Sequence, residues 1–321
     1  LAPIDRTEPS PTPGRSSAVP SAPPSPSPAP AASATPAPLT RAEMERVLAE
    51  LGPVPQGIDW KAAREYDSTV WTCPPGKVRE CLVVDGTGPT VLFVGDSSAR
   101  TLMPVLTKLA KERGFRLYAS ILPACSWMAG VRRPDVSVDA ACVAQRESWY
   151  ARAVPAIAPD VLLLHERGYR ETVDESTARA ADPAVDALPI DARERTLATR
   201  TLDLLAPLVP AIVILEPFPT DYGADPTECL ASSRRIATCA FLDRPVRIEG
   251  TLRELATGYP DVRLVDLDRV VCPTYPLCVP YQDGRVIWRD GTHVATGTWE
   301  TRRREVWQAL RSTGAFAGAD G

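Results

Sequence analysis

Short, continuous apolar runs alternate with longer amphipathic segments from residue 90 to the C-terminal end of the chain. The first run, TVLFVG (90–95), has an entirely apolar interior, which is typical of a strand buried in a parallel sheet. The next segment, RTLMPVLTKLAKERG (100–114), spaces its apolar residues as an amphipathic helix does, with Pro104 early enough to be tolerated. We therefore predict a strand followed by a helix. Four later runs have the same strand-like character: FRLYASIL (115–122), DVLLLHE (160–166), AIVILEP (211–217) and VRLVDLD (262–268).

Helix-like segments separate these later strands: CVAQRESWYARAVPAIA (142–158), RERTLATRTLDLLAPLV (193–209) and RRIATCAFLDRPVRIEGTLRELATGY (234–259). Regular alternation of strand and helix predicts a parallel sheet with helices on both faces. We expect a three-layer α/β/α fold with a doubly wound, mainly parallel, five-stranded sheet. The last segment, GRVIWRDGTHVATGTWETRRREVWQALRS (284–312), predicts a short strand, a loop and a final helix. In such sheets ligands bind beyond the carboxyl ends of the strands, so the residues that follow TVLFVG are well placed to bind one.

The first part of the chain has a different composition. Residues 1–39 are rich in Pro, Ala and Ser and nearly lack large apolar side chains, so they cannot bury enough surface to offset chain entropy. We predict a disordered, extended linker there, and a tail without a role is the alternative. Residues 40–84 begin with a capping box, Thr40 with Glu43, and are expected to form an N-terminal helix and a disulfide loop that pack on the core. The core itself is expected in residues 85–321.

The charge and hydropathy of the chain exclude some functions. The formal net charge is −4 and neither sign forms a long run, which argues against a nucleic acid partner. No apolar run approaches the ~20 residues that span a bilayer, and no charged segment followed by an apolar core marks a signal peptide. The chain begins with Leu1, so we expect that any membrane anchor lies outside it.

The eight cysteines fall into four pairs that are close in sequence, each in or beside an expected loop. Eight cysteines allow about a hundred pairings, so pairing between sequence neighbours is an expectation only. Zinc binding is the alternative, but the chain has no CxxC motif and only 2 histidines. Disulfides in this number indicate an oxidising compartment outside the cytoplasm. The neighbouring pairs are Cys73 and Cys81, Cys125 and Cys142, Cys229 and Cys239, and Cys272 and Cys278.

A serine stands at the carboxyl end of the first strand, in VGDSSAR. Ser97 needs a base to act as a nucleophile, because a free hydroxyl is weakly nucleophilic. Near the C-terminus, His293 has a carboxylate three residues before it, Asp290 in RDGTH. In a loop before a helix, this spacing lets Asp290 accept the Nδ1–H of His293 and leaves Nε2 free for the serine proton. Taken singly, Ser97 is an ordinary helix cap, Asp290 a turn and His293 a surface residue. Together, in this order, they indicate a catalytic triad.

The segments FVGDSSAR (93–100) and DGTH (290–293) resemble the first and last sequence blocks of the SGNH (GDSL-like) hydrolases. The chain is most similar to the extracytoplasmic SGNH domain fused to acyltransferase-3 membrane proteins, in its GDS before a helix, a CSW-like patch, local cysteine pairs and a terminal DGTH. The resemblance covers about residues 85–312. It implies the flavodoxin-like SGNH fold and a serine acyl-enzyme mechanism. In that mechanism Ser97 is the nucleophile, His293 the general base and then acid, and Asp290 the carboxylate that orients the histidine.

The oxyanion donors that the resemblance implies are only partly matched. The backbone N–H of Ser97 supplies one donor. The family has an oxyanion Gly after its second strand and a Gly-x-Asn block after its third, and the corresponding segments here are LPACSWMAG (122–130) and HERGYR (165–170). Because one lost donor costs roughly 10²–10³ in rate, substitutes are required for efficient catalysis. We expect these substitutes among Ser126, Arg167 and Gly168.

Four further residues stand where the carboxyl ends of the strands are expected, and we consider them as substrate contacts. An aromatic residue there could stack on a sugar, whereas the alternative is an anchor in the core or in a loop. For the histidine and the glutamate of this group, an ion pair with Arg167 is the alternative. The four residues are Trp127, His165, Glu166 and Tyr169.

Together these features predict an extracytoplasmic serine O-acyltransferase or acylesterase that acts on short, acetyl-like groups of a cell-surface carbohydrate or glycolipid. Its partners would be an acyl donor, a carbohydrate acceptor and a membrane acyltransferase part that precedes this chain. No cofactor or metal is implied. The missing Asn block favours the alternative of a non-catalytic glycan-binding domain that assists a membrane acyltransferase. A stand-alone secreted carbohydrate esterase is a third possibility.

Overall fold

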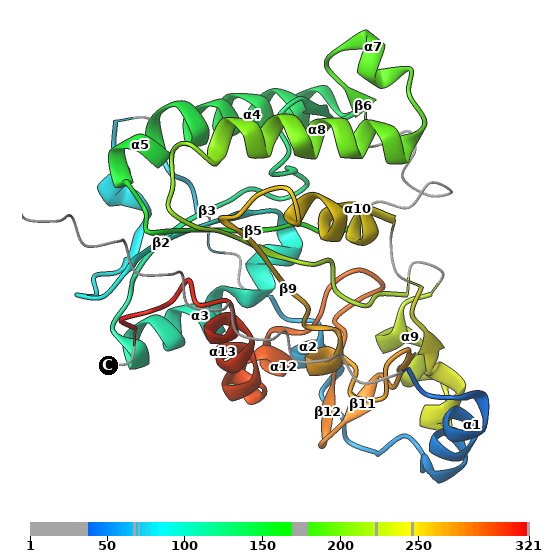
Figure 1. The fold of residues 1–321 in the computed structure, drawn as a ribbon. Helices are drawn as coiled ribbons and strands as arrows, with labels where there is room; N and C mark the ends of the chain where they lie inside the picture. Colours follow the sequence, from blue (N-terminus) through cyan, green and yellow to red (C-terminus); the bar gives the residue numbers. More distant parts are fainter. Residues whose placement is uncertain are drawn as a thin grey trace, which may run out of the picture. The chain divides into compact units, whose positions relative to one another are not determined.

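A computed structural model shows the fold (Figure 1). It describes residues 38–66, 69, 71–74, 76–168, 179–221, 224–244 and 247–319. The chain divides into two units, Leu1–Ala37 and Pro38–Gly321, and all that follows concerns the second. The predicted linker lies outside the described residues except for its last two, and the predicted boundaries after residues 39 and 84 stay predictions.

A six-stranded sheet forms the centre of this unit, with the strand order β1-β3-β2-β5-β7-β9. All neighbouring strands are parallel except β1, which pairs antiparallel with β3 at one edge. The five predicted strands and the three-layer fold class are therefore confirmed, and β1 is an addition. The strands are β1 (Leu82–Val84), β2 (Thr90–Gly95), β3 (Arg116–Ile121), β5 (Val161–His165), β7 (Ile212–Leu215) and β9 (Val262–Val265).

The strand order places a functional position at the end of β2. The chain runs from β2 outward to β3 and then returns to the other side of β2, where β5 begins the run toward β9. Such a reversal opens a crevice at the carboxyl ends of the strands, and ligands bind there in doubly wound sheets. Gly95 and His165 are the last residues of β2 and β5, and they are paired in the register of these two strands. Both therefore lie at this crevice.

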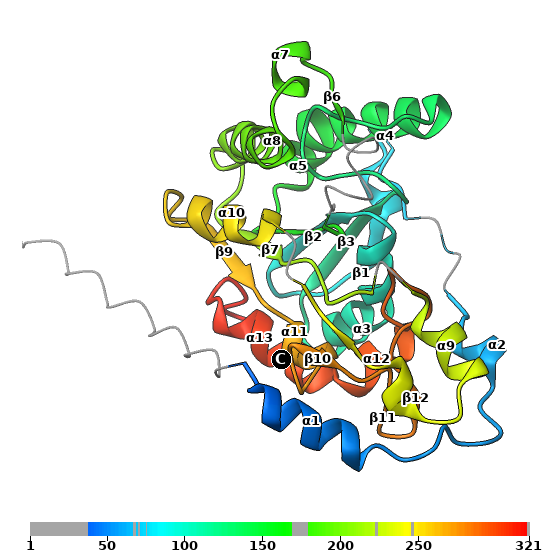
Figure 2. The ribbon, with the colours of Figure 1, turned by 90° about the vertical axis from the view of Figure 1, so that its right-hand side faces the viewer.

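Helices cover both faces of the sheet (Figures 1 and 2). Successive strand residues point to opposite faces, so Phe93 contributes to one buried cluster and Leu92 to the other. The cluster of Phe93 contains residues of α3 (Ser97–Arg113), α12 (Thr296–Thr301) and α13 (Arg303–Ser312). The cluster of Leu92 contains residues of α4 (Val136–Ser148), α5 (Val154–Ile157), α8 (Ile190–Leu205) and α10 (Arg247–Ala256).

Some predicted helices have different limits. The final helix is divided at Arg302 into α12 and α13, and a π-helical turn (Trp149–Ala153) joins α4 to α5. The prediction of helix over 234–259 is wrong for much of the segment. Cys239 is tied back to Cys229, and the two residues after Ala240 form a strand, β8, that pairs with β10. Only α10 is helical within the later part of that segment.

The N-terminal segment packs on a third, smaller cluster, next to α9 and away from the central sheet (Figure 1). Thr40 caps α1 and Glu43 bonds back to the Thr40 backbone, which confirms the predicted capping box. Side chains of α1 and α2, such as Val47 and Trp60, pack against α9 and the β11–β12 hairpin. The remaining elements are α1 (Arg41–Glu50), α2 (Trp60–Ala63), η1 (Val78–Cys81), β4 (Val131–Arg132), β6 (Arg179–Ala180), α7 (Pro183–Asp186), α9 (Pro226–Ser232), η3 (Ile236–Cys239), β8 (Phe241–Leu242), α11 (Asp268–Val271), β10 (Leu277–Cys278), β11 (Tyr281–Gln282) and β12 (Arg285–Val286).

The eight cysteines form four disulfides between sequence neighbours, so their sulfurs are not available as zinc ligands. The two cysteines of each bond are between 6 and 17 positions apart in the sequence. Among the described residues, none of the helices has the length and apolar content needed to cross a bilayer. The bonds join Cys73 to Cys81, Cys125 to Cys142, Cys229 to Cys239, and Cys272 to Cys278.

Candidate active site

Ser97 is the first residue of α3, directly beyond the end of β2. The helix is capped by Asp96, whose Oδ1 accepts the backbone N–H groups of Ser98 at 2.8 Å and Ala99 at 3.4 Å. The capping side chain is therefore that of Asp96 and not that of Ser97. This leaves the Ser97 hydroxyl for another partner and keeps the Ser97 N–H in the first turn, where helical N–H groups have no intrahelical acceptor.

Gly95 allows the tight turn between β2 and α3. A Cβ at this position would stand 2.2 Å from the carbonyl oxygen of His165 and 2.4 Å from the Cβ of Ala99. No larger residue fits without moving β5 or the helix. The glycine of the GDS motif thus fixes how closely the start of α3 approaches the neighbouring strand.

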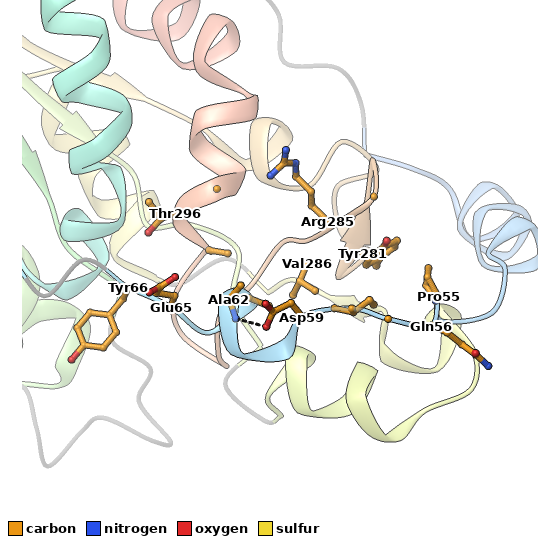
Figure 3. Close-up of a pocket in the computed structure, with 16 residues that line it drawn as sticks. Pro55, Gln56, Asp59, Ala62, Glu65, Tyr66, Tyr281, Arg285, Val286 and Thr296 are labelled. Atoms are coloured by element: carbon orange, nitrogen blue, oxygen red, sulfur yellow. Dashed lines mark hydrogen bonds between the residues drawn. The ribbon is translucent and has the colours of Figure 1, made fainter.

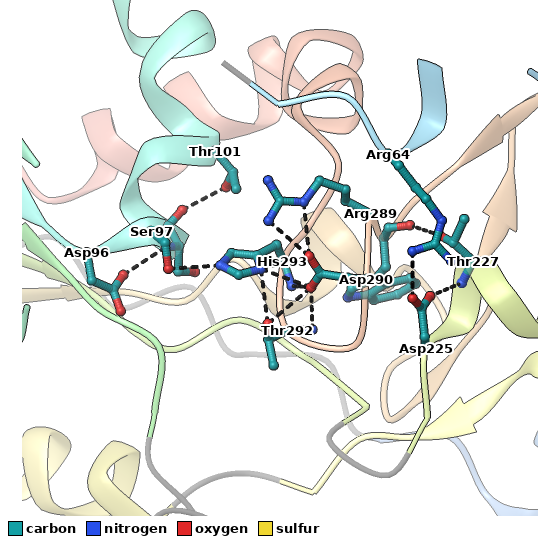
Figure 4. A network of polar contacts seen from close by, with 12 residues as sticks. Arg64, Asp96, Ser97, Thr101, Asp225, Thr227, Arg289, Asp290, Thr292 and His293 are labelled. Atoms are coloured by element: carbon teal, nitrogen blue, oxygen red, sulfur yellow. Dashed lines mark hydrogen bonds and ion pairs between the residues drawn. The ribbon is translucent and has the colours of Figure 1, made fainter. Parts of the chain in front are cut away.

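His293 lies against Ser97, although 196 positions separate the two residues in the sequence. The distance from its Nε2 to the Ser97 Oγ is 2.9 Å, and its Nδ1 lies 2.9 and 3.0 Å from the carboxylate oxygens of Asp290 (Figure 4). With Nδ1–H donating to Asp290, Nε2 is the acceptor of the serine proton. The structure thus brings together the three residues predicted from the GDS and DGTH motifs.

The Asp290 carboxylate is held in place by several donors. Its Oδ1 accepts the backbone N–H groups of Thr292 at 2.8 Å and His293 at 2.9 Å, and Arg289 forms an ion pair with it at 2.9 Å (Figure 4). Burial opposes ionisation of this carboxyl group. The hydrogen bond and charge of His293, the Thr292 N–H and the Arg289 charge outweigh that effect and hold the pKa of Asp290 well below its usual range. Asp290 is therefore an anion at neutral pH.

The helices on the Phe93 face of the sheet align the two halves of the site. The indole Nε1–H of Trp299, on α12, donates to the Thr101 hydroxyl of α3 at 2.9 Å, and that hydroxyl donates to the Ser98 carbonyl at 2.7 Å. On the opposite side, Gly291 approaches the loop before α9 so closely that a Cβ there would stand 2.8 Å from the Ala224 carbonyl oxygen. These contacts fix the loop that carries His293 relative to the helix that carries Ser97.

Three of the four predicted substrate contacts, Trp127, His165 and Glu166, have buried side chains, which does not favour contact with a substrate. Trp127 is 1 % exposed and His165 is 0 % exposed. The His165 Nδ1 bonds to the Leu215 carbonyl and Nε2 to the Ser98 hydroxyl, so neither nitrogen reaches solvent. Their place at the ends of strands suggested access, but α3 covers His165, and Trp127 packs in the buried cluster of Leu92. Tyr169 lies outside the described residues.

The remaining predicted residues line the interior behind the site. Ser126 is fully buried, and its hydroxyl accepts the N–H of Met128 at 2.9 Å. Burial raises the pKa of Glu166 to about 8, although a hydrogen bond from Ser126 favours the charged form. The backbone N–H of Arg167 donates to Asp96 Oδ2 at 3.2 Å, so it supports the helix cap. Gly168 is buried and is the last described residue of its loop.

The turn after β3 contains a residue with glycine-like geometry. Ala124 has a φ of 57°, in the left-handed region that favours glycine. The N–H of Leu122 donates to the Gly95 carbonyl at 3.0 Å and holds this turn beside the GDS segment. The family places its oxyanion glycine after the second strand, so an alanine here occupies the corresponding turn. A sequence comparison that looks only for a glycine in this turn does not identify Ala124.

The Ser97 hydroxyl opens on a pocket of about 270 Å³. Beside the serine, the wall includes two arginines, and neither was predicted as a site residue. Arg100 lies three residues after Ser97 and thus on the same side of α3, which is the one sequence signal for it. The lining residues are Tyr66, Ser97, Arg100, Thr101, Pro123, Arg289 and Thr296.

A larger groove of about 750 Å³ adjoins this pocket, because Tyr66 and Thr296 line both (Figure 3). One wall comes from the segment around α2, including Gln56, Asp59 and Glu65. The other comes from the β11–β12 hairpin, which contributes Tyr281 and Arg285. The N-terminal segment therefore forms part of the approach to Ser97.

The family model of the SGNH domain (fused to AT3 domains) matches residues 64–296, well over half of the chain. The chain belongs to this family. It is therefore an SGNH-type enzyme, an acyltransferase or an ester hydrolase. The matched range begins just before Tyr66 and includes Ser97, Asp290 and His293.

Solved structures with the same fold share little sequence with the chain. The periplasmic domain of a lipopolysaccharide acetyltransferase from Salmonella ser. Paratyphi A is 11% identical, with a TM-score of 0.52, and the match covers 80% of this chain and 98% of that one. An acetylxylan esterase from Geobacillus stearothermophilus, solved as a catalytic mutant, is 15% identical, with a TM-score of 0.41 and coverage of 72% and 96%. A comparison with curated protein sequences gives no match.

Proposed function

We propose that the chain transfers short acyl groups through a covalent intermediate on Ser97, with His293 as general base and acid and Asp290 as its orienting carboxylate. The observation that carries this proposal is the 2.9 Å distance from Ser97 Oγ to His293 Nε2, combined with the 2.9 Å contact of His293 Nδ1 with Asp290. A nucleophile, a base and an orienting group in hydrogen-bond contact are the geometric requirement for serine acyl transfer.

The first half-reaction forms the acyl-enzyme. Ser97 Oγ attacks the carbonyl carbon of the acyl donor while its proton passes to His293 Nε2, and the carbonyl oxygen becomes an oxyanion. The Ser97 N–H at the start of α3 is one donor to that oxyanion, and we place the second at the backbone N–H of Ala124. The tetrahedral intermediate then expels the leaving group, which takes the proton from His293, and an ester of Ser97 remains.

In the second half-reaction, an acceptor hydroxyl gives its proton to His293 and attacks the Ser97 ester. Collapse of the second tetrahedral intermediate releases the new ester and returns the proton to Ser97. With a sugar hydroxyl as acceptor the enzyme is an O-acyltransferase, and with water it is an esterase. The groove of about 750 Å³ beside the pocket, with Tyr66 and Tyr281 in its walls, gives a carbohydrate acceptor room and aromatic surface.

The proposal includes the location and the partner. Four disulfides favour an oxidising compartment, so we place the domain outside the cytoplasm. The family is described as fused to AT3 domains, and we infer that such a membrane part supplies the acyl group to Ser97. The similar Salmonella structure is the periplasmic domain of a lipopolysaccharide acetyltransferase, which agrees with our proposal of a surface carbohydrate as acceptor.

The proposal is tested with para-nitrophenyl acetate and a fluorophosphonate probe. We expect hydrolysis and covalent labelling of the wild type, loss of both in Ser97→Ala, and loss of labelling in His293→Ala. Ser312→Ala is the matched control, since this exposed serine lies at the end of α13. If acetylated sugar forms when sugar acceptors are added to this reaction, the result favours transfer over hydrolysis. Equal turnover by wild type and Ser97→Ala would exclude the covalent mechanism and favour a glycan-binding role.

A further inference from the structure

Two guanidinium groups lie in the pocket that contains Ser97. Arg100 extends from α3, one turn after the serine, and Arg289 directly precedes Asp290. Both lie against the ring of Tyr66, with the guanidinium carbons 5.8 Å (Arg100) and 4.8 Å (Arg289) from the ring centre. Three segments that are distant in sequence therefore bring two positive charges to one small space.

The charge of this pocket is not balanced. Arg289 pairs with Asp290, which His293 also contacts, so its charge is partly offset. Within the described chain, the Arg100 guanidinium has no ion pair or hydrogen bond, and its interaction is with the ring of Tyr66. Among the described residues that line the pocket, none is acidic. The positive end of α3, a 17-residue helix that begins at Ser97, adds to the field.

We propose that the substrate bound at Ser97 has a negatively charged group, a carboxylate or a phosphate, that Arg100 and Arg289 bind. This inference rests on the proposed function, which places the reacting ester at Ser97. Guanidinium groups bind planar oxyanions through paired, charge-assisted hydrogen bonds and are weakly hydrated, so they suit such a group. Contact of both arginines with Tyr66 restricts their side chains before the substrate arrives, which lowers the entropy cost of binding.

The charged group could belong to either half of the ester. One source is the acyl group itself, as in the half-ester of a dicarboxylic acid, which a pocket of about 270 Å³ accommodates next to the serine. The other source is the alcohol side, an acidic sugar or a phosphate on the donor or acceptor. Both present the same chemistry to the arginines, and a pair of matched substrates distinguishes them.

The test compares kcat/KM for two pairs of aryl esters that differ in one charge. In the first pair the charge is on the acyl side: the para-nitrophenyl half-ester of succinic acid against para-nitrophenyl pentanoate. In the second it is on the alcohol side: para-acetoxybenzoate against para-acetoxybenzamide. We expect the wild type to prefer the charged member of one pair by about tenfold, and that pair identifies the source. Arg100→Gln should remove most of this preference, as loss of a charge-assisted hydrogen bond does, so that the charged and neutral members of the pair react at similar rates.

Lys108→Gln is the matched control, because it removes one positive charge from an exposed position of the same helix. It should leave the preference intact, and Arg100→Lys should retain part of it. Equal rates for both members of both pairs, with Ser97-dependent turnover of para-nitrophenyl acetate, would overturn the anion site and leave the proposed function standing.

A binding measurement keeps the inference testable if turnover is absent. Calorimetric titration of Ser97→Ala protein with the same four esters reports affinity without chemistry. Tighter binding of a charged member, lost in the double variant with Arg100→Gln, supports the anion site even if the proposed function fails. Equal affinity for charged and neutral members would overturn it.

Discussion

The hydroxyl of Ser98 lies 2.9 Å from Nε2 of His165, one residue along α3 from the contact between Ser97 and His293. On the other side of the ring, Nδ1 lies 3.1 Å from the Leu215 carbonyl, so Nδ1 donates and Nε2 accepts. The ring stacks on Phe218 with 4.0 Å between the ring centres. The ring thus joins β5, β7 and the start of α3, and its contacts require the neutral tautomer with the proton on Nδ1.

The first prediction concerns acid stability. Burial lowers the pKa of His165 to about 4 from an ordinary value of 6.5. Between these values the unfolded chain binds a proton that the folded chain does not, so the free energy of unfolding falls as the pH falls through this window. We expect this residue to contribute a loss of up to about 3 kcal/mol, at 1.36 kcal/mol per pKa unit.

Urea unfolding at a series of pH values from 7 to 4, for the wild type, His165→Gln and His293→Gln, measures this contribution. His165→Gln should have a flatter dependence than the wild type, although it loses stability at pH 7. His293→Gln retains the buried His165 ring, so its stability should depend more steeply on pH than that of His165→Gln. A slope in His165→Gln as steep as in the wild type would contradict the assignment.

The second prediction concerns the carboxylate that orients His293. Asp290→Asn replaces an acceptor by an amide that donates to Nδ1 as readily as it accepts, so the histidine adopts the wrong tautomer for a base. We expect kcat for para-nitrophenyl acetate to fall by about 10³–10⁴, with KM little changed. Asp85→Asn is the control, since its side chain is 70% exposed and pairs with Arg116 at the sheet edge. A fall of less than about tenfold would mean that Asp290 does not set the tautomer.

The sequence predicts the inner strands because they are short apolar runs with both faces buried, as in the fully buried Val161–His165. It does not predict β1, because three half-buried residues leave no such pattern. The prediction of a helix over 234–259 is wrong for a different reason. The apolar spacing of this segment does not reveal that a disulfide to Cys229 and pairing of β8 with β10 override helix formation.

The residues of the site are likewise predictable only where a local sequence motif marks them. Ser97, Asp290 and His293 are predictable because GDS and DGTH each place their residues locally, and the strand order brings the two motifs together. Tyr66 is not predictable in this way, since its relation to the site is purely tertiary. His165 was expected to face a substrate because it ends a strand, yet the tight packing of α3 at Gly95 covers it.

The third prediction tests that packing. In Gly95→Ala, the new Cβ must displace the His165 carbonyl or the Ala99 methyl, which stand 2.2 and 2.4 Å from its position. We expect the free energy of unfolding to fall by about 3 kcal/mol, at the upper end for overpacking in a core, and activity to fall with it. Gly52→Ala is the matched control, because no atom lies within 4 Å of a Cβ there. Its stability should change by less than about 0.5 kcal/mol, and equal effects of the two variants would argue against a close approach at Gly95.

The fourth prediction concerns the turn beside the site. Ala124, with a φ of 57°, and Ala158, with a φ of 48° at the end of α5, both hold a left-handed conformation that costs an L-residue about 1–2 kcal/mol. Glycine adopts it freely, although part of the gain is lost to its larger unfolded-state entropy. We expect Ala124→Gly and Ala158→Gly each to raise the free energy of unfolding by about 1 kcal/mol, measured by urea titration.

The two variants separate strain from side-chain packing. Ala158 precedes β5 at the end of the sheet opposite to the carboxyl ends of the strands, where Ser97 lies. Ala158→Gly therefore reports strain relief alone, with activity unchanged. Ala124→Gly keeps the backbone geometry that the proposed oxyanion contact needs, so we expect kcat to stay within about twofold of the wild type while stability rises. A rise in stability at Ala158 with a loss at Ala124 would mean that the Ala124 methyl group packs more favourably than the strain costs. In that case alanine would be favoured in this turn for its side chain, in place of the family glycine.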